Sequence, residues 1–246
     1  MRHDDGSETD SGHQLDQDHA GEIPAAGLFS EAFWDERYRS SSAVWSGNPN
    51  PQLMAEAASL QPGDALDVGC GEGADAIWLA ERGWRVTAVD ISTIALERGA
   101  AYARQVSSDV AGRITWQQVD LLEWGPAPQT YDLVSAQFMQ LPAQLRVGLF
   151  ERLAASVAVG GTLLIVGHSP TDLHTTAARP PLPELFFTAK EIAAALDPSL
   201  WMVIVSEARP RVVRDPDGHL VTVHDEVFAV RRAWPAGRRA RHLPIR

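Results

Sequence analysis

Between residues 64 and 166, short apolar runs alternate with longer segments in which apolar residues recur at helical spacing. The apolar runs predict strands at Asp64–Val68, Trp84–Val89, Ile114–Val119, Tyr131–Ala136 and Thr162–Val166. The intervening segments predict helices at Ala74–Arg82, from Ser92 through Tyr102, and at Ala143–Val157, the last ended by Gly160-Gly161. This alternation indicates a parallel sheet with right-handed crossovers.

The last third of the chain departs from this pattern. Residues 168–183 form a proline-rich loop, and a capping box at Thr188–Glu191 predicts a helix through Leu196. A strand is expected at Trp201–Val205. Two further strands, 211–214 and 220–223, flank a turn at 215–218, and strands joined by so short a turn must be antiparallel. The mainly parallel sheet is therefore expected to end in an antiparallel hairpin.

The segment before the first strand is rich in aromatic residues. Residues 28–38 predict a helix with Ser30 as its N-cap, and a second helix is expected over 51–60. The side chains of Trp34, Tyr38 and Trp45 either pack against the sheet or form a lid over a ligand, and the sequence leaves both alternatives open.

Composition and charge narrow the class of protein. The net charge of −11 and the pI near 5.1 argue against a nucleic-acid partner. Residues 1–27 are acidic with few large apolar side chains, so we expect disorder there, and residues 233–246 form a basic tail. We thus expect one domain over 28–232. No apolar run is long enough to span a membrane, and no signal peptide is evident, so a cytoplasmic protein without a membrane partner is expected.

The candidate chemistry lies in the segment Asp67-Val-Gly-Cys-Gly-Glu-Gly73 between the first strand and its helix. Glycines at this position make a tight turn and let a ligand approach the backbone, which is typical of nucleotide binding. The carboxylate of Asp67 would repel a pyrophosphate and attract a cation, which favours S-adenosylmethionine (SAM) over a dinucleotide. Asp90, about 20 residues on, could accept from the ribose hydroxyls of either ligand. The single cysteine, Cys70, excludes an intramolecular disulfide, and no metal site is expected.

Together these motifs resemble the class I SAM-dependent methyltransferases over about residues 50–232. The resemblance rests on Asp67 with its glycines, Asp90, Asp120-Leu121, the run Tyr131–Val134, and the terminal hairpin. It implies a Rossmann-like, doubly wound, seven-stranded α/β fold. The aromatic motif Phe33–Tyr38 with Trp45 is similar to the small-molecule branch that includes thiopurine and tellurite-resistance-type enzymes.

The resemblance also implies roles for individual residues. The SAM-binding set would be Trp45, Asp67, Gly69, Cys70, Gly71, Gly73, Asp90, Ile91, Asp120, Leu121 and Gln137. Asp90 would hold the ribose, Ile91 and Asp120 the adenine, and Gln137 would lie near the ammonium and the methyl. His168, which follows the fifth strand, is a candidate base or substrate contact; the catalytic residue is otherwise unassigned.

The expected function is methyl transfer from SAM to a small-molecule acceptor. One alternative is an NAD(P)-dependent oxidoreductase, which leaves Asp67 and Asp120 unexplained and for which no Tyr-x-x-x-Lys pair is present. Another is a non-catalytic SAM-binding protein, because fold does not imply activity. Neither the acceptor nor the oligomeric state can be inferred from the sequence.

Overall fold

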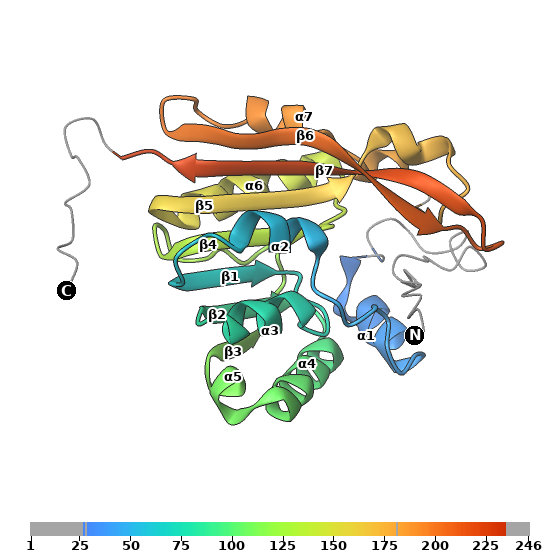
Figure 1. The fold of residues 1–246 in the computed structure, drawn as a ribbon, viewed down its shortest axis with the longest axis horizontal. Coiled ribbons are helices and arrows are strands. Elements are labelled where there is room, and N and C mark those ends of the chain that lie inside the picture. The colour runs from blue at the N-terminus through green and yellow to red at the C-terminus, as the bar shows by residue number, and fades with distance from the viewer. Residues whose placement is uncertain (1–26, 28, 181, 235–246) are drawn as a thin grey trace, which may run out of the picture.

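The computed structural model describes residues 27, 29–180 and 182–234, and its centre is one seven-stranded sheet of order β3-β2-β1-β4-β5-β7-β6 (Figure 1). The strands are β1 (Asp64–Val68), β2 (Arg85–Asp90), β3 (Ile114–Gln118), β4 (Tyr131–Gln137), β5 (Val157–His168), β6 (Trp201–Arg214) and β7 (Leu220–Arg232). Strands β1 to β5 are parallel, and β7 is antiparallel to both β5 and β6. This confirms the predicted fold. The predicted disordered segment and basic tail lie almost wholly outside the described residues.

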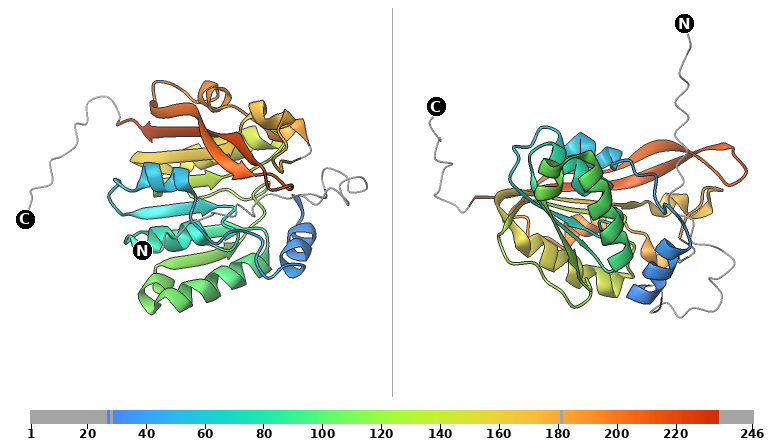
Figure 2. Two further views of the ribbon diagram at one scale, coloured as in Figure 1. Left: turned by 45° about the vertical axis from the view of Figure 1, so that its right-hand side comes forward. Right: turned by 90° about the horizontal axis from the view of Figure 1, so that it is seen from below.

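Helices cover both faces of the sheet (Figure 2). They are α1 (Glu31–Arg39), α2 (Pro51–Ala57), α3 (Ala74–Glu81), α4 (Thr93–Val106), α5 (Ser108–Gly112), α6 (Ala143–Ser156) and α7 (Ala189–Ala194), with short 3-10 turns η2 (Pro170–His174) and η3 (Pro183–Leu185). One core joins the sheet to α2, α3, α4 and α5, and the other joins it to α6 and α7. The central strands are therefore buried on both faces, as their continuous apolar sequences predict.

The carboxyl ends of the parallel strands share one edge of the sheet, where ligands bind in folds of this kind. Helix α1 lies beyond that edge, and the β6–β7 hairpin projects past the end of β5 on the same side (Figure 1). The N-cap of α1 is as predicted, because the Ser30 side chain accepts from the Phe33 backbone N–H. Among the described residues, no helix has both the length and the apolarity needed to cross a bilayer.

Several predicted element boundaries are wrong, most of all in the last third of the chain. Helix α6 ends at Ser156, because Val157 already pairs with Tyr131, and Gly160-Gly161 lie within β5 rather than at the helix end. Strand β6 is continuous from Trp201 to Arg214, where two separate strands were expected. Its polar middle pairs with β7 all along, which a search for apolar runs cannot detect. Helix α5 was not predicted at all.

Candidate functional site

The loop after β1 adopts a backbone that only glycine tolerates easily. Gly69 and Gly71 have φ of +68° and +52°, in the left-handed region. A β-carbon at Gly69 would collide with the sulfur of Met139, and one at Gly71 would lie 2.9 Å from Nε1 of Trp45. The loop is thus approached closely from two directions, by the segment after β4 and by the segment before α2.

Gly73 and Cys70 have different surroundings from these two glycines. A β-carbon at Gly73 would overlap the ring of Trp116 on β3, so this glycine permits close packing inside the fold. Burial, followed by the nearby Asp90 and Asp67, raises the pKa of the Cys70 thiol well above its usual value. A thiol held neutral is a poor nucleophile, so Cys70 is not suited to nucleophilic catalysis.

Three carboxylates surround the glycine loop. Burial raises the pKa of Asp67 well above its usual value, with the nearby Asp75 and Asp90 adding to the effect. Burial likewise raises the pKa of Asp75, to about 6, and that of Asp90. The backbone N–H groups of Gly71 and Ser92 donate to Asp90 at 2.8 and 2.9 Å. These acids repel one another, so a cationic ligand would relieve the repulsion and a pyrophosphate would increase it.

Two buried oxygens at the carboxyl ends of β1 and β4 have no hydrogen-bond partner among the described residues. They are Oδ2 of Asp67 and Oε1 of Gln137. The two strands are neighbours, and Asp67 is paired in register with Ser135, whose hydroxyl accepts from Nε2 of Gln137 at 2.7 Å. A buried acceptor without a donor is costly. Both oxygens therefore suit an ammonium or sulfonium, and the residues present fit SAM.

The residue after Gln137 has a strained backbone. Phe138 has φ of +53°, which is rare for a bulky residue. Its N–H donates to the Val166 carbonyl at 2.7 Å, which ties the turn to β5. This turn brings Met139 onto Gly69. Strain of this kind concentrates at ligand sites.

A cavity of about 280 Å³ opens at the ends of β2 and β3. It is lined by Ser30, Glu31, Ile91, Gln118, Val119 and Asp120. Ile91 and Asp120, the predicted adenine contacts, are thus brought together, whereas the side chain of Leu121 is buried in the core. The sequence did not point to Ser30 or Glu31, because they belong to α1, far from the loop along the chain.

The segment before α2 packs on the glycine loop rather than on the sheet. Oε2 of Glu72 accepts from the backbone N–H groups of Val44 and Trp45 at 3.1 and 3.3 Å. Nε1 of Trp45 donates to the Tyr38 hydroxyl at 2.8 Å. Arg98 on α4 pairs with Glu72 at 3.0 Å and also donates to backbone carbonyls of the segment. Of the two alternatives for Trp45, this geometry matches a lid.

His168 is fully buried at the end of β5. Its ring centre lies 4.6 Å from that of Phe138 and 6.1 Å from that of Phe186. The ring is therefore packed among aromatic side chains, and its contact with a substrate stays a prediction. Sequence reasoning missed Glu72, Asp75 and Met139; the acids could have been found from their position in and just after the loop, whereas nothing in the sequence marks Met139.

Residues 65–161 match the profile of a family described as "Methyltransferase domain". Over 127 residues the chain is 28% identical to 2-heptyl-1-hydroxyquinolin-4(1H)-one methyltransferase of Mycobacteroides abscessus, covering 50% of this chain and 54% of the relative. It is 30% identical over 108 residues to probable thiol methyltransferase 2 of Arabidopsis thaliana, covering 43% and 46%. The chain thus spans about half the length of the curated relatives it matches.

Solved structures share the fold. A protein solved in work on the conversion of a disulfide bond into a thioacetal group during echinomycin biosynthesis has a TM-score of 0.64 at 21% identity, covering 84% of this chain and 93% of that one. TehB from Haemophilus influenzae has a TM-score of 0.57 at 19% identity, covering 82% and 66%. At these identities the solved structures show a shared fold, and together with the profile match over residues 65–161 and the terminal hairpin they make the chain similar to class I SAM-dependent methyltransferases.

Proposed function

We propose that this protein transfers a methyl group from SAM to a small-molecule acceptor. The observation that carries the proposal is the pair of buried, unpartnered oxygens on Asp67 and Gln137 beside a left-handed glycine loop. Such oxygens are stabilised by a cationic ligand and by nothing that the described chain itself supplies.

Each part of the site has a role in this proposal. Asp67 and Gln137 would bind the cationic end of SAM, Asp90 the ribose, and the cavity beside Ile91 and Asp120 the adenine. When bound, SAM supplies a methyl group on a positively charged sulfur. The chain contributes alignment of the reactants, which is worth about 7–11 kcal/mol in well-oriented systems.

The lid excludes water from the reacting atoms. Trp45 and Tyr38 cover Gly71, and both are fixed through Glu72 and Arg98. Their aromatic faces also tolerate a neighbouring cation. Closing the site in this way strengthens the electrostatic attraction between the carboxylates and the cationic ligand.

The proposed acceptor is a small, flat molecule. The ring of Phe138, which follows β4, lies beside that of His168 at the end of β5, and the His168 ring in turn lies beside that of Phe186. Aromatic side chains at this edge suit a ring system. The names of the two curated relatives, a hydroxyquinolinone methyltransferase and a thiol methyltransferase, support a small molecule carrying oxygen or sulfur.

The test has two steps. Isothermal titration calorimetry should give a micromolar-range dissociation constant for SAM and no binding of NAD⁺. Incubation with SAM and candidate acceptors should then produce S-adenosylhomocysteine together with methylated acceptor. Absence of SAM binding would overturn the proposal. SAM binding without turnover of hydroxylated or thiol-bearing aromatic acceptors would instead support the non-catalytic alternative.

A further inference from the structure

Met139 lies over the corner of the site where the cationic end of SAM is proposed to bind. Val68 of β1 pairs in register with Ala136 of β4. The next residues, Gly69 and Gln137, therefore follow side by side at the carboxyl edge of the sheet. The sulfur of Met139 takes up the space that a β-carbon of Gly69 would need, and its Cγ and Cε would lie 3.7 and 3.5 Å from that carbon. The end of the side chain thus covers the first glycine of the loop.

The backbone of Phe138 directs Met139 to this place. Its φ of +53° turns the chain back after β4, and its N–H donates to the Val166 carbonyl at 2.7 Å, which fixes the turn. A left-handed backbone is costly for a bulky residue, and such strain persists where the surrounding structure requires it. In this turn, the strain places one flexible side chain on the glycine loop.

Met139 differs from the other neighbours of the glycine loop in its freedom to move. The lid over Gly71 is held by the hydrogen bond from Trp45 to Tyr38 at 2.8 Å, and the group over Gly73 is a rigid indole. The Met139 side chain is only partly buried, unbranched and adaptable, with three rotatable bonds. It can therefore swing away from the loop at a lower cost than the aromatic neighbours.

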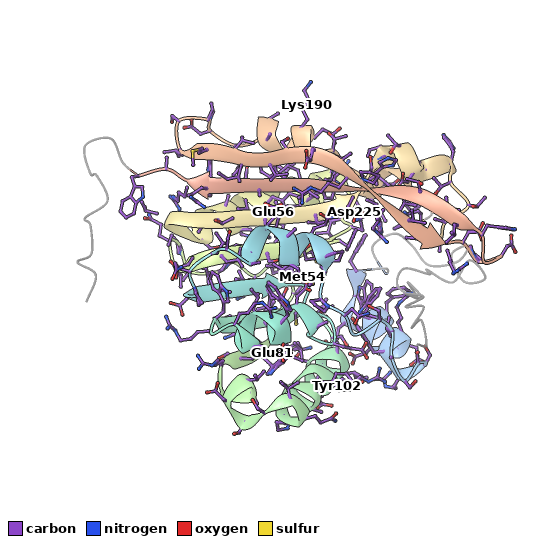
Figure 3. The ribbon with its side chains drawn as sticks, in the orientation of Figure 1. Met54, Glu56, Glu81, Tyr102, Lys190 and Asp225 are labelled. Atoms are coloured by element: carbon purple, nitrogen blue, oxygen red, sulfur yellow. The ribbon has the colours of Figure 1, made fainter. Side chains whose placement is uncertain are left out.

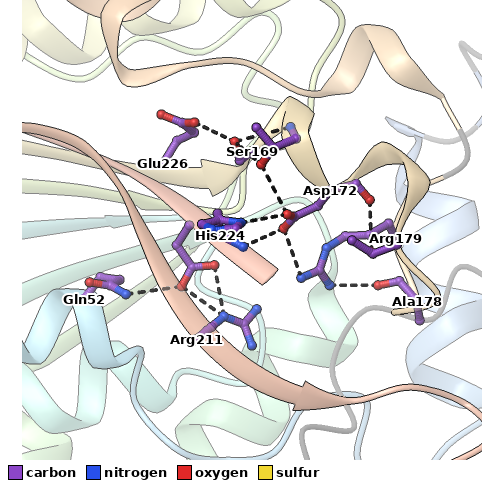
Figure 4. A network of polar contacts seen from close by, with 11 residues as sticks. Gln52, Ser169, Asp172, Ala178, Arg179, Arg211, His224 and Glu226 are labelled. Atoms are coloured by element: carbon purple, nitrogen blue, oxygen red, sulfur yellow. Dashed lines mark hydrogen bonds and ion pairs between the residues drawn. The ribbon is translucent and has the colours of Figure 1, made fainter. Parts of the chain in front are cut away.

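Beyond the end of β5, the same edge of the sheet is closed by paired polar groups (Figure 4). The Ser169 hydroxyl donates to Glu226 at 2.7 Å. Nδ1 of His224 lies 3.0 Å from Oδ1 of Asp172, which is 1% exposed. Moving this network would separate buried polar groups from their partners, which is costly. Of the described groups around the corner, Met139 is thus the one best suited to open it.

We propose that Met139 is a gate for the methyl donor: it covers the glycine loop in the ligand-free protein and swings aside to let the cationic end of SAM reach Asp67 and Gln137. This inference rests on the proposed function. The conformation that binds SAM is then only a fraction of the ligand-free protein, and the observed association rate and affinity are lowered by that fraction. The gate acts on the methionine part of the ligand, because the cavity proposed for the adenine lies at the ends of β2 and β3.

Stopped-flow fluorescence measures the association of SAM with the full chain. Met139→Ala should raise the association rate constant at least about threefold, because the variant has no closed conformation. Met139→Leu restores an apolar cover of similar volume and should return the rate constant to within about twofold of wild type. Met54→Ala, which removes a methionine that is 39% exposed on α2, is the matched control and should leave the rate constant unchanged.

The movement itself is measured by NMR on protein with isotope-labelled methionine methyl groups. The chain has four methionines, so the signals can be assigned by substitution. Saturating SAM should shift the Met139 signal. Those of Met54 and Met202, which are 39% and 52% exposed on α2 and β6, should stay in place.

Adenosine is the control ligand, because it lacks the methionine part. Its affinity should be the same for wild type and Met139→Ala, and a change larger than twofold would mean that the substitution disturbs the whole loop, which would overturn the gate. An increase in SAM association below threefold, or a Met139 signal unmoved by SAM, would also overturn it. So would a Met139→Leu variant as fast as Met139→Ala, because the effect would then belong to the sulfur and not to the cover. Failure of the wild-type protein to bind SAM would instead overturn the proposed function.

Discussion

Two buried aspartates on the same sheet have opposite surroundings. Asp67 on β1 is 2% exposed, its pKa is raised by burial and by two neighbouring acids, and its Oδ2 has no partner among the described residues. Asp225 on β7 is 1% exposed, but Nε of Arg211 lies 3.0 Å from both of its oxygens and Gln52 of α2 donates to it at 3.2 Å. Figure 3 labels Asp225 on β7 and Glu56 on the neighbouring α2.

The difference separates groups that hold the fold together from groups that bind a ligand. A buried carboxylate with a cation and a donor is compensated within the chain, and breaking the pair costs stability. A buried carboxylate without either one destabilises the free protein and gains from a cationic ligand. The charge of Asp225 is thus compensated within the chain, whereas that of Asp67 is available to the proposed cationic ligand.

The largest expected effect is on the compensated side. Asp225→Asn should lower the free energy of unfolding by about 2–3 kcal/mol, because it removes a buried carboxylate that Arg211 and Gln52 both bind, with some relief from solvent at the partly exposed guanidinium. SAM affinity of the folded protein should stay within twofold. Chemical denaturation gives the first quantity and calorimetry the second.

Asp217→Asn, at the exposed turn of the same hairpin, is the control and should change stability by less than about 0.5 kcal/mol. If Asp225→Asn weakened SAM binding tenfold while leaving stability unchanged, the comparison between the two aspartates would be wrong.

The sequence predicted well those features of the fold whose signals are local. Strand β1 was predicted with its exact limits, and Ser30, Ser92 and Thr188 cap the helices that they were expected to cap. Each of these depends on residues within a few positions of one another. The continuous β6 depends on pairing with β7, and the end of α6 depends on Val157 meeting Tyr131, neither of which a local pattern records.

The residues of the candidate site were likewise predicted where their signal is local in the sequence and missed where it is not. Asp67, Asp90 and the glycines were found from their spacing, whereas Ile91 and Asp120 were found through the family resemblance. The structure brings all of them to the carboxyl edge of the sheet. The position of Met139 over Gly69 was not found, because it depends on the strained turn at Phe138.

Asp90 shares features with both Asp225 and Asp67, because it is paired within the chain and is also proposed to bind the ligand. Its replacement therefore tests the difference between the two kinds of aspartate. It already accepts from Gly71 and Ser92, and it is also the proposed ribose ligand. Asp90→Ala should weaken SAM binding by more than about 1.5 kcal/mol, because the ribose hydroxyls and the Gly71 N–H lose their acceptor. Calorimetric titration measures the loss. An unchanged dissociation constant would remove Asp90 from the site.

Asp67→Asn should separate stability from binding. The substitution removes an ionisable group whose burial is unfavourable, so the ligand-free protein should be no less stable than wild type at pH 7.5. SAM affinity should fall about tenfold, or about 1.4 kcal/mol, because the attraction to the cation is lost. Thermal unfolding with and without SAM measures both. A destabilised variant with full SAM affinity would assign Asp67 to the compensated class.

The smallest expected effect is a pH dependence of SAM affinity. The folded-state pKa of Asp75 is raised to about 6, and those of Asp67 and Asp90 are raised too. The folded, ligand-free protein therefore binds more protons than the unfolded chain above pH 4, and these groups destabilise it progressively as pH rises through about 6.

A cationic ligand favours the ionised carboxylates, so SAM should bind about fivefold more tightly at pH 7 than at pH 5, with release of protons. Calorimetry in buffers of different ionisation enthalpy measures that release. S-adenosylhomocysteine, which has no charge on sulfur, should show a weaker pH dependence. Equal pH dependence for the two ligands would mean that the carboxylates respond to the ammonium group alone. It would rule out a contribution to binding from the attraction between the carboxylates and the sulfonium.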